Sequence, residues 1–453
     1  MWNAGARREQ RPPGPTAWIH RFPLKYSAVA WGIAVAAVLA SVGCRNQRAE
    51  REEVRIWAMG KEGEHLSTLL AEFSRQFPAT PVRLQRIPWS AAHEKLLTAH
   101  VAGTLPDVVQ LGSTWIPEFV AIGAIEPLDE WMGGRELERD WFPGVAEANR
   151  IDGRLWAVPW YVDTRLLFYR RDLLAMAGVF APPATWEEWR HAMETIRSSG
   201  PGRFGLLAPL NEWQLLVALA FQQGAALLRD DDTRANFQAP EFRRAFDFYV
   251  SLFRDELAPF AGEAQVANVY QDFAAGRFAF FVTGPWNLAE FHRRLPRELA
   301  GAWATAPLPA PRAGMVGTSV AGGSSLAIVR SSPRKAKAWQ LVSFLLQTEQ
   351  QVQWYRMSGD LPARRSAWEN QALRDDEPVR AFRVQLEHAR GVPKVPEWER
   401  ITSLLMEHVE LVVRGRMDAD RALQALDAKV DRVLAKRRWL RARAQASTRG
   451  NTP

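Results

Sequence analysis

The chain has 453 residues, enough for two or three domains, and its 47% hydrophobic and 24% charged residues are typical of a globular protein. Its formal net charge of +8 belongs to the ends, because residues 1–43 carry a net +4 and the segment from Arg432 onward a net +7, which leaves the body at −3. This distribution argues against a nucleic-acid-binding face, and the single cysteine excludes an internal disulfide and a cysteine-based metal site.

The N-terminus carries a candidate export signal. Five basic residues precede an apolar run at residues 27–42, which is shorter than the roughly 20 residues of a membrane-spanning helix and suits a signal peptide. Gly43 and Cys44 follow, an arrangement that resembles a bacterial lipoprotein signal, although Ser41 stands where that signal usually has Leu. We expect residues 1–43 to be a signal peptide, Cys44 to be lipidated and residues 44–53 to be a linker. A plain cleaved signal and an uncleaved anchor remain alternatives, and each places the body outside the cytoplasm.

The next segment alternates between strand and helix patterns. It predicts strands at 54–59, 81–87 and 106–112 and helices at 64–77, 90–103 and 113–123. This order predicts a parallel sheet with helices on both faces. Ligands of such sheets bind outside the carboxyl ends of the strands, so the loops 60–65 and 112–115 should bring Glu64, Ser113, Thr114 and Trp115 to a binding edge.

The middle of the chain contains a buried, strand-like run, residues 155–174, that is interrupted by one carboxylate, Asp163. An unpaired buried charge is costly, so Asp163 should lie at a surface or meet a partner. Thr185 and Glu188 form a predicted capping box at the start of a helix-rich stretch. The strand at 276–286 runs into a Gly-Pro turn that should display Trp286. A proline-rich crossing at 306–314, a small-residue strand and helices to the end complete the chain.

Motifs of catalysis and metal binding are not recognisable. The stretch "GPGRFG" at 200–205 matches a dinucleotide loop in letters only, because it follows a helix and contains Pro201. The eight histidines have no ligand spacing, and "GGSSLA" at 322–327 lacks the second Gly of a nucleophile elbow. We therefore predict no metal, no cofactor and no catalytic residue.

Four stretches together resemble one family. They are "GRLWAVPWYVDTRLLFYRRDLLAMAG…PPATWEEW" (153–189), "FAAGRFAFFVTGPW" (273–286), "GTSVAGGSSLAIVRSSPRKAKAWQLVSFL" (317–345) and "SGDLPAR" (358–364). In this order they resemble the extracytoplasmic solute-binding proteins of ABC importers, in the branch of the maltose-binding and glycerol-3-phosphate-binding proteins. The resemblance runs from about residue 54 to residue 434.

The resemblance implies an α/β fold of two lobes, each a mainly parallel sheet flanked by helices, with hinge crossings near residues 161–163, 311–314 and 357–361. The implied division is an N-lobe of residues 54–162 and 314–357, a C-lobe of residues 163–313 and 358–435, and a basic flexible tail of residues 436–453. The ligand would lie between the lobes, and the closed form would be presented to a membrane permease.

The resemblance also implies a ligand site. Its candidate residues are Glu64, Ser113, Tyr161, Asp163, Trp286, Gly322, Gly323, Ser324 and Arg364. Such a set suits a sugar, which needs acceptors and donors for its hydroxyls and an apolar face for stacking. Relatives often carry Asp at the place of Ser113, and some sugar binders an aromatic at the place of Ser324. Both departures count against maltose or trehalose.

Each candidate also has a purely structural interpretation. Trp286 and Tyr161 could belong to the core, Arg364 could cap a helix or neutralise Asp360, and the two glycines could serve only the backbone geometry.

We predict a monomeric, membrane-anchored binding lipoprotein that captures a sugar or sugar derivative and delivers it to an ABC permease. Binding of glycerol-3-phosphate or a glycerophosphodiester by the same fold, an extracellular glycan-processing enzyme and a sensory partner of a receptor kinase remain alternatives.

Overall fold

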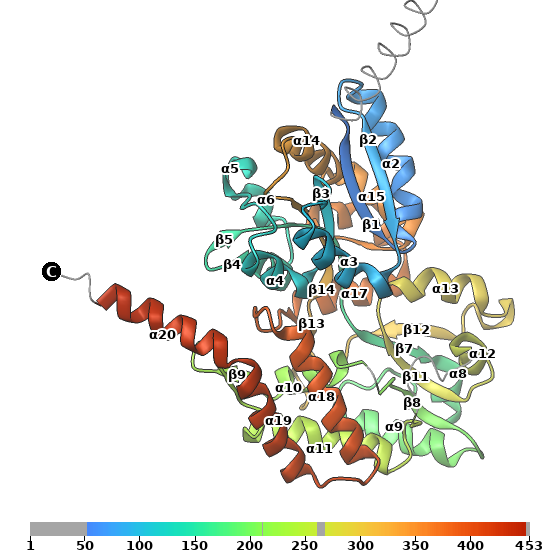
Figure 1. Cartoon of the computed structure of the whole chain (residues 1–453). Helices are drawn as coiled ribbons and strands as arrows, with labels where there is room; N and C mark the ends of the chain where they lie inside the picture. Colours follow the sequence, from blue (N-terminus) through green and yellow to red (C-terminus); the bar gives the residue numbers. More distant parts are fainter. Residues whose placement is uncertain (1–51, 211, 261–267, 450–453) are drawn as a thin grey trace, which may run out of the picture. The chain divides into compact units, whose positions relative to one another are not determined.

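The computed structural model describes residues 52–210, 212–260 and 268–449, and from Val54 onward the chain forms one compact unit (Figure 1). Two sheets organise this unit, and four clusters of buried side chains pack on their faces. The predicted signal sequence and Cys44 lie outside the described residues.

The first sheet contains the three strands that the N-terminal pattern predicts. Its strands are β1 (Val54–Met59), β2 (Val82–Ile87), β3 (Val108–Gly112), β6 (Val158–Asp163), β14 (Gly322–Ile328) and β15 (Leu361–Pro362), in the order β15-β6-β14-β3-β1-β2. β1 is parallel to β2 and β3, as predicted, whereas β14 is antiparallel to β3 and β6. Four of the six strands, β1, β2, β3 and β6, therefore run in one direction, and β14 and β15 run in the other.

Helices cover both faces of this sheet. They are α2 (Glu62–Gln76), α3 (Trp89–Val101), α4 (Ile116–Ala121), α14 (Lys335–Leu345) and α15 (Thr348–Ser358). Alternate residues of a strand point to opposite faces, so Ile56 packs in the cluster with α2 and α14 while Trp57 packs in the cluster with α3. The apolar residues Leu66, Leu69, Leu70 and Phe73 of α2 are buried, and Leu66 and Phe73 are fully inaccessible to solvent.

The second sheet has the strands β7 (Leu166–Arg170), β8 (Phe204–Leu207), β11 (Phe278–Thr283) and β12 (Trp303–Ala306), in the order β12-β7-β11-β8. β8 and β11 are parallel, and the other pairs are antiparallel. Its helices are α8 (Arg171–Met176), α9 (Trp186–Ser198), α10 (Gln214–Gln222), α11 (Pro240–Arg254), α12 (Val269–Ala274), α13 (Trp286–Arg294), α17 (Glu377–Glu387), α18 (Trp398–Val413) and α19 (Ala419–Val433). The capping box of Thr185 and Glu188 at the start of α9 is confirmed.

Two of the crossings between the sheets lie side by side. Only Thr164 and Arg165 separate β6 of the first sheet from β7 of the second. The Thr164 hydroxyl donates to the carbonyl of Val320 at 2.8 Å, and the Ser319 hydroxyl donates to the carbonyl of Arg165 at 2.7 Å. The return crossing is thereby joined to the first one. β15 still pairs with β6, so the chain leaves the first sheet later than the boundary expected at residue 358.

Short elements fill the connections: η1 (Ser113–Trp115), α5 (Asp129–Met132), α6 (Glu136–Arg139), α7 (Pro143–Ala148), β4 (Arg150–Ile151), β5 (Arg154–Leu155), β9 (Leu228–Arg229), β10 (Arg234–Ala235), η3 (Arg297–Leu299), β13 (Ser319–Val320), η4 (Arg365–Glu369), α16 (Gln371–Arg374) and β16 (Ala389–Arg390). The segment expected to be a flexible tail continues as helix α20 (Ala435–Arg449). Across the described part of the chain, no helix combines the length and the apolar character needed to span a membrane.

Candidate functional site: a cavity between the two sheets

A cavity of about 810 Å³ lies between residues of the first sheet and residues of the second. One wall consists of the loops that follow β1 and β3, together with the end of β6 and the beginning of β14. The opposite wall consists of the segment before α10, the first residues of α13 and the beginning of α18. The loops after β1 and β3 are at the carboxyl ends of parallel strands, where ligands of α/β sheets bind.

The structure brings six of the nine candidate residues into the cavity wall. These residues are Ser113, Tyr161, Asp163, Trp286, Gly322 and Gly323. Glu64, Ser324 and Arg364 are not in the wall. The structure thus places six of the predicted residues at the cavity wall and three elsewhere in the fold.

Glu62, rather than Glu64, brings the carboxylate of α2 into the cavity. The helix begins at Glu62, two residues earlier than the sequence pattern indicated. Residues two apart on an α-helix point in directions about 200° apart, so Glu64 faces solvent when Glu62 faces the cavity. Glu62 Oε1 accepts hydrogen bonds from the hydroxyl of Tyr161 at 2.7 Å and from Trp89 Nε1 at 3.1 Å.

Tyr161 is buried, and its hydroxyl sits between two polar partners. It donates to Glu62 and accepts from Gln110 Nε2 at 3.2 Å. Burial and the negative charge of Glu62 raise the pKa of Tyr161 well above its ordinary value. The hydroxyl is therefore a neutral donor at physiological pH, and it orients Glu62.

Asp163 ends β6, and its side chain is 20% exposed. Its Oδ1 accepts a hydrogen bond from Arg165 Nη1 at 3.1 Å. Burial raises the pKa of Asp163, while the positive charge of Arg165 partly opposes that rise. The acid that interrupts the buried strand pattern thus has both a partner and access to the cavity.

The two glycines make room for these groups. A Cβ on Gly322 would lie 2.3 Å from Asp163 Oδ1, so any larger residue at this position would displace the carboxylate. Gly323 has φ +123°, and its Cβ would lie 2.4 Å from the carbonyl oxygen of Tyr161. The Asp163 carboxylate therefore accounts for Gly322, and the backbone geometry accounts for Gly323.

Trp286 is the first residue of α13 and is 39% exposed, unlike a core tryptophan. A Cβ on Gly284 would lie 2.1 Å from its indole, so the glycine of the "GPW" turn lets the ring fold back over the turn. The ring faces the guanidinium of Arg165, whose carbon is 4.5 Å from the ring centroid. An accessible indole face suits stacking on the C–H face of a sugar.

Ser324 and Arg364 are occupied elsewhere. Ser324 is 1% exposed, and its hydroxyl donates to the carbonyl of Leu111 at 3.1 Å within the first sheet. Arg364 Nε donates to Asp140 Oδ2 at 2.7 Å. Both side chains therefore stabilise the fold around the first sheet, and Arg364 pairs with Asp140 rather than with Asp360.

Several wall residues are not in the predicted set. The aromatic ones are Trp89, Trp115, Trp213 and Tyr270, and the charged ones are Lys61, Glu62, Arg165, Glu212, Glu290, Arg294, Asp360 and Glu399. Trp115 follows from the loop that the β-α pattern assigned to the binding edge. Lys61 and Glu62 likewise lie in the loop at 60–65 that was assigned to this edge. The other residues lie in segments that reach the cavity through packing between distant parts of the chain.

Six carboxylates and three cationic side chains line the cavity, so its wall has a negative balance. Asp360 is 8% exposed, and its pKa lies well above the ordinary value because of burial and the nearby charge of Glu62. All three cations have acidic partners: Lys61 and Arg294 contact Glu290, and Arg165 contacts Asp163. The wall therefore offers acceptors for hydroxyl groups and no uncompensated cation for an anion.

Two polar contacts join opposite walls. Lys61 Nζ lies 2.7 Å from Glu290 Oε1, which connects the loop after β1 to α13. The hydroxyl of Thr114 donates to Glu399 Oε1 at 2.7 Å, which connects η1 to α18. Opening of the cavity by separation of the two sheets would break both contacts.

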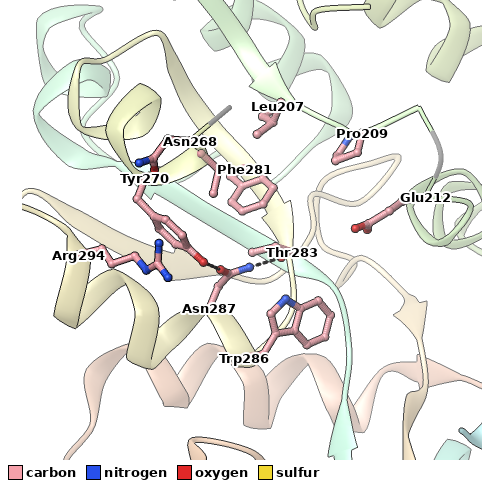
Figure 2. Close-up of a pocket in the computed structure, with 11 residues that line it drawn as sticks. Leu207, Pro209, Glu212, Asn268, Tyr270, Phe281, Thr283, Trp286, Asn287 and Arg294 are labelled. Atoms are coloured by element: carbon pink, nitrogen blue, oxygen red, sulfur yellow. Dashed lines mark hydrogen bonds between the residues drawn. The ribbon is translucent and has the colours of Figure 1, made fainter. Parts of the chain in front are cut away.

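A side pocket of about 350 Å³ adjoins the cavity and shares Glu212, Tyr270, Trp286 and Arg294 with it (Figure 2). Figure 2 shows Tyr270 and Arg294 on one side of this pocket and Glu212 on the other. The hydroxyl of Tyr270 donates to Asn287 Oδ1 at 2.7 Å, and this contact fixes the ring beside the beginning of α13. Among the described residues, no group of three or more His, Cys, Asp or Glu side chains could hold a metal ion.

The fold and the cavity are those of a two-lobed solute-binding protein, and the sequence agrees. Residues 60–352 match the family described as bacterial extracellular solute-binding protein, so the chain belongs to that family. The predicted resemblance is confirmed, as is the prediction of a binding protein rather than an enzyme. Membership of this family places the protein outside the cytoplasm.

Solved structures and curated relatives agree with this assignment. The sugar-binding protein MalE from the phytopathogen Xanthomonas citri is 47% identical, with a TM-score of 0.82 over 86% of this chain and 98% of the other. A solute-binding protein of an ABC transporter from Thermotoga lettingae, bound with α-D-tagatose, is 25% identical, with a TM-score of 0.74 over 84% of this chain and 100% of the other. The diacetylchitobiose-binding protein DasA from Streptomyces coelicolor is 24% identical and covers 82% of this chain and 88% of its own length. The chain is therefore similar to sugar-binding proteins of ABC transporters.

Proposed function

We propose that this protein captures an uncharged sugar or oligosaccharide in the cavity between its two lobes and delivers it to the permease of an ABC importer. The observation that carries the proposal is the composition of the wall. It combines an accessible indole, that of Trp286, with the carboxylates of Glu62 and Asp163 and the hydroxyl of Tyr161. Such a set can stack on one face of a sugar ring and accept hydrogen bonds from its hydroxyls.

The charge of the wall favours an uncharged sugar over glycerol-3-phosphate or a glycerophosphodiester. A phosphate group needs cationic partners that are not already neutralised. Lys61 and Arg165 have acidic partners across or within the cavity, and Arg364, the cation that would suit a phosphate, pairs with Asp140 outside it. A phosphorylated ligand would meet the six carboxylates instead.

A thermal-shift screen of residues 45–453, which omit the predicted signal peptide and Cys44, tests the proposal. Its panel contains tagatose, maltose, maltotriose, galacto-oligosaccharides and diacetylchitobiose, with glycerol-3-phosphate and glycerophosphocholine as the anionic arm. A bound ligand raises the melting temperature by mass action, and we expect a shift with at least one uncharged sugar. A shift only with the phosphorylated compounds, or with none of the panel, would refute the proposed function.

Substitutions then locate the site. Asp163→Asn and Trp286→Ala should each weaken the best sugar at least 10-fold in isothermal titration, because each removes a direct contact worth about 1.4 kcal/mol or more. Trp439→Ala is the matched control, since Trp439 is 57% exposed on α20 and is absent from the cavity wall. Equal affinities of the Trp286 and Trp439 variants would place the ligand elsewhere.

We also propose that Cys44 carries a lipid anchor and that the protein is a monomer. The lipid anchor is inferred from the apolar segment of residues 27–42, which precedes Gly43 and Cys44. The full chain, expressed in a bacterial host, should enter the detergent phase on Triton X-114 partition and incorporate labelled palmitate, and Cys44→Ser should abolish both. Label that persists in the Cys44→Ser chain would contradict the assignment.

A further inference from the structure

Arg165 connects three parts of the cavity wall. It is 8% exposed, and its guanidinium contacts Asp163 Oδ1 at 3.1 Å, Glu212 Oε2 at 3.6 Å and the indole of Trp286 at 4.5 Å from the ring centroid. Asp163 belongs to the end of β6 in the first sheet, whereas Glu212 and Trp286 precede and begin helices of the second. One side chain thus touches wall residues that belong to different sheets.

The backbone of Arg165 is held in place independently of these contacts. Its carbonyl accepts the hydroxyl of Ser319 at 2.7 Å, and the preceding Thr164 donates to Val320 at 2.8 Å. Arg165 therefore extends from the point where the crossing from β6 to β7 is joined to the return crossing before β14. A guanidinium anchored there can hold its partners in a fixed arrangement without help from a ligand.

We propose that Arg165 is the positioning residue of the sugar site: its planar guanidinium holds the Asp163 carboxylate and the Trp286 indole in the arrangement that a sugar ring requires. This inference rests on the proposed function. Its physical basis is the shape of the group, which donates in its plane and stacks through its face. In-plane donation orients the acceptor Asp163, and face contact orients Trp286.

The charge of Arg165 has a second consequence. Burial raises the pKa of Asp163, and Arg165 opposes the rise. The other charged groups that line this part of the cavity are Glu62, Asp360 and Glu212, all acidic, so none of them can replace Arg165. If a sugar hydroxyl donates to the carboxylate, affinity is present above the pKa of Asp163 in the free protein and is lost as the pH falls through it. Removal of Arg165 should move this loss to higher pH.

The test compares two variants. Arg165→Met removes both the positive charge and the planar guanidinium, whereas Arg165→Lys keeps the positive charge but not the planar group. The affinity for the best sugar of the panel is measured by isothermal titration between pH 4 and pH 8. We expect Arg165→Met to shift the acid loss of affinity upward by at least one pH unit, and Arg165→Lys to leave it near the wild-type position. Arg364→Met is the matched control, because Arg364 also pairs with a carboxylate, that of Asp140, but is not in the cavity wall, and its profile should keep the wild-type shape.

The indole is monitored without any ligand. The Nε1–H resonance of Trp286, assigned by its absence in Trp286→Phe, should move in both Arg165 variants, because both lose the stacked plane. In the background of Trp286→Ala, Arg165→Lys should cost less than 2-fold in affinity, against 5-fold or more in the wild-type background. Coincident pH profiles for Arg165→Met and wild type would overturn the proposal. An equal loss of affinity on Arg165→Lys in the wild-type and Trp286→Ala backgrounds would also overturn it. If the wild-type chain binds no sugar of the panel but the Trp286 resonance still moves in the Arg165 variants, the proposed function is refuted and the positioning of Trp286 by Arg165 stands.

Discussion

The contact between Lys61 and Glu290 should hold the two walls of the cavity together. Glu290 lies on α13 with its side chain 11% exposed, and it contacts Lys61 across the cavity and Arg293 and Arg294 on its own helix. Burial alone would raise the pKa of Glu290, but the hydrogen bonds from these three cations lower it to about 2. The carboxylate is therefore ionised at every pH at which the protein would function. We expect Lys61→Gln to favour the open form.

The size of the effect follows from the exposure of the lysine. The lowered pKa corresponds to about 3 kcal/mol in favour of the ionised form, but three cations share it and Lys61 is 69% exposed, where water screens its charge. The cross-cavity contact should therefore contribute about 0.5–1 kcal/mol, which is about a 2- to 5-fold change in the ratio of closed to open forms. Sugar affinity should fall by the same factor, because the ligand stabilises the closed form.

A double-mutant cycle measures this contribution. Lys61→Gln, Glu290→Gln and the double variant are compared by sugar titration and by the radius of gyration in solution scattering, with Arg293→Gln as the same-helix control. The ion pair is present above the unfolded pKa of Glu290 and lost as the pH falls towards 2, so the coupling should be constant between pH 6 and pH 8. A coupling below about 0.3 kcal/mol, together with an unchanged radius of the ligand-free Lys61→Gln chain, would refute the role of this contact.

Three further substitutions probe the wall and the fold. Gly284→Ala should displace the indole of Trp286, whose nearest ring atom would lie 2.1 Å from the new Cβ, and should cost nearly as much sugar affinity as Trp286→Ala in the same titration. Asp360→Asn should raise the free energy of unfolding in urea at pH 7, by about 1.4 kcal/mol for each unit by which the pKa of Asp360 is raised, and the gain should vanish as the pH falls below the unfolded value of 3.8. Asp107→Ala removes a fully buried carboxylate that pairs with Arg334, and should cost about 3–5 kcal/mol of stability in the same denaturation assay.

The sequence predicted the residues whose local pattern is unusual. Asp163 was predictable because one acid interrupts a run of buried strand residues, and Trp286 because a Gly-Pro turn follows a buried strand. Glu64 was wrong because the selection of a side chain on α2 depends on where the helix begins, and a shift of two residues turns the side chain to the opposite face.

The other cavity residues and the order of the strands depend on packing between segments that are distant in the sequence. The sequence alone does not show whether a tryptophan lines a cavity or packs in the core. Trp213 lines the cavity, whereas Trp160 packs in the core with its ring centroid 4.3 Å from that of Trp354. Likewise, the antiparallel entry of β14 between β3 and β6 follows from pairing with strands more than 150 residues away in the chain. Periodicity along one segment carries no information about either choice.

The position of the candidate site relative to the crossings explains how one site can be built from two sheets. Asp163 is the last residue of β6, and only Thr164 and Arg165 separate it from β7. A rotation of one sheet against the other at these crossings moves Asp163 little, because it lies beside the axis, whereas Glu290 on α13 moves much more. We therefore expect the wall of Glu62, Tyr161 and Asp163 to persist in the open form and the contact between Glu290 on α13 and Lys61 to form on closure. Arg165 lies between β6 and β7, close to the axis of rotation. We therefore expect its contacts with Asp163 and Trp286 to be present in both the open and the closed form.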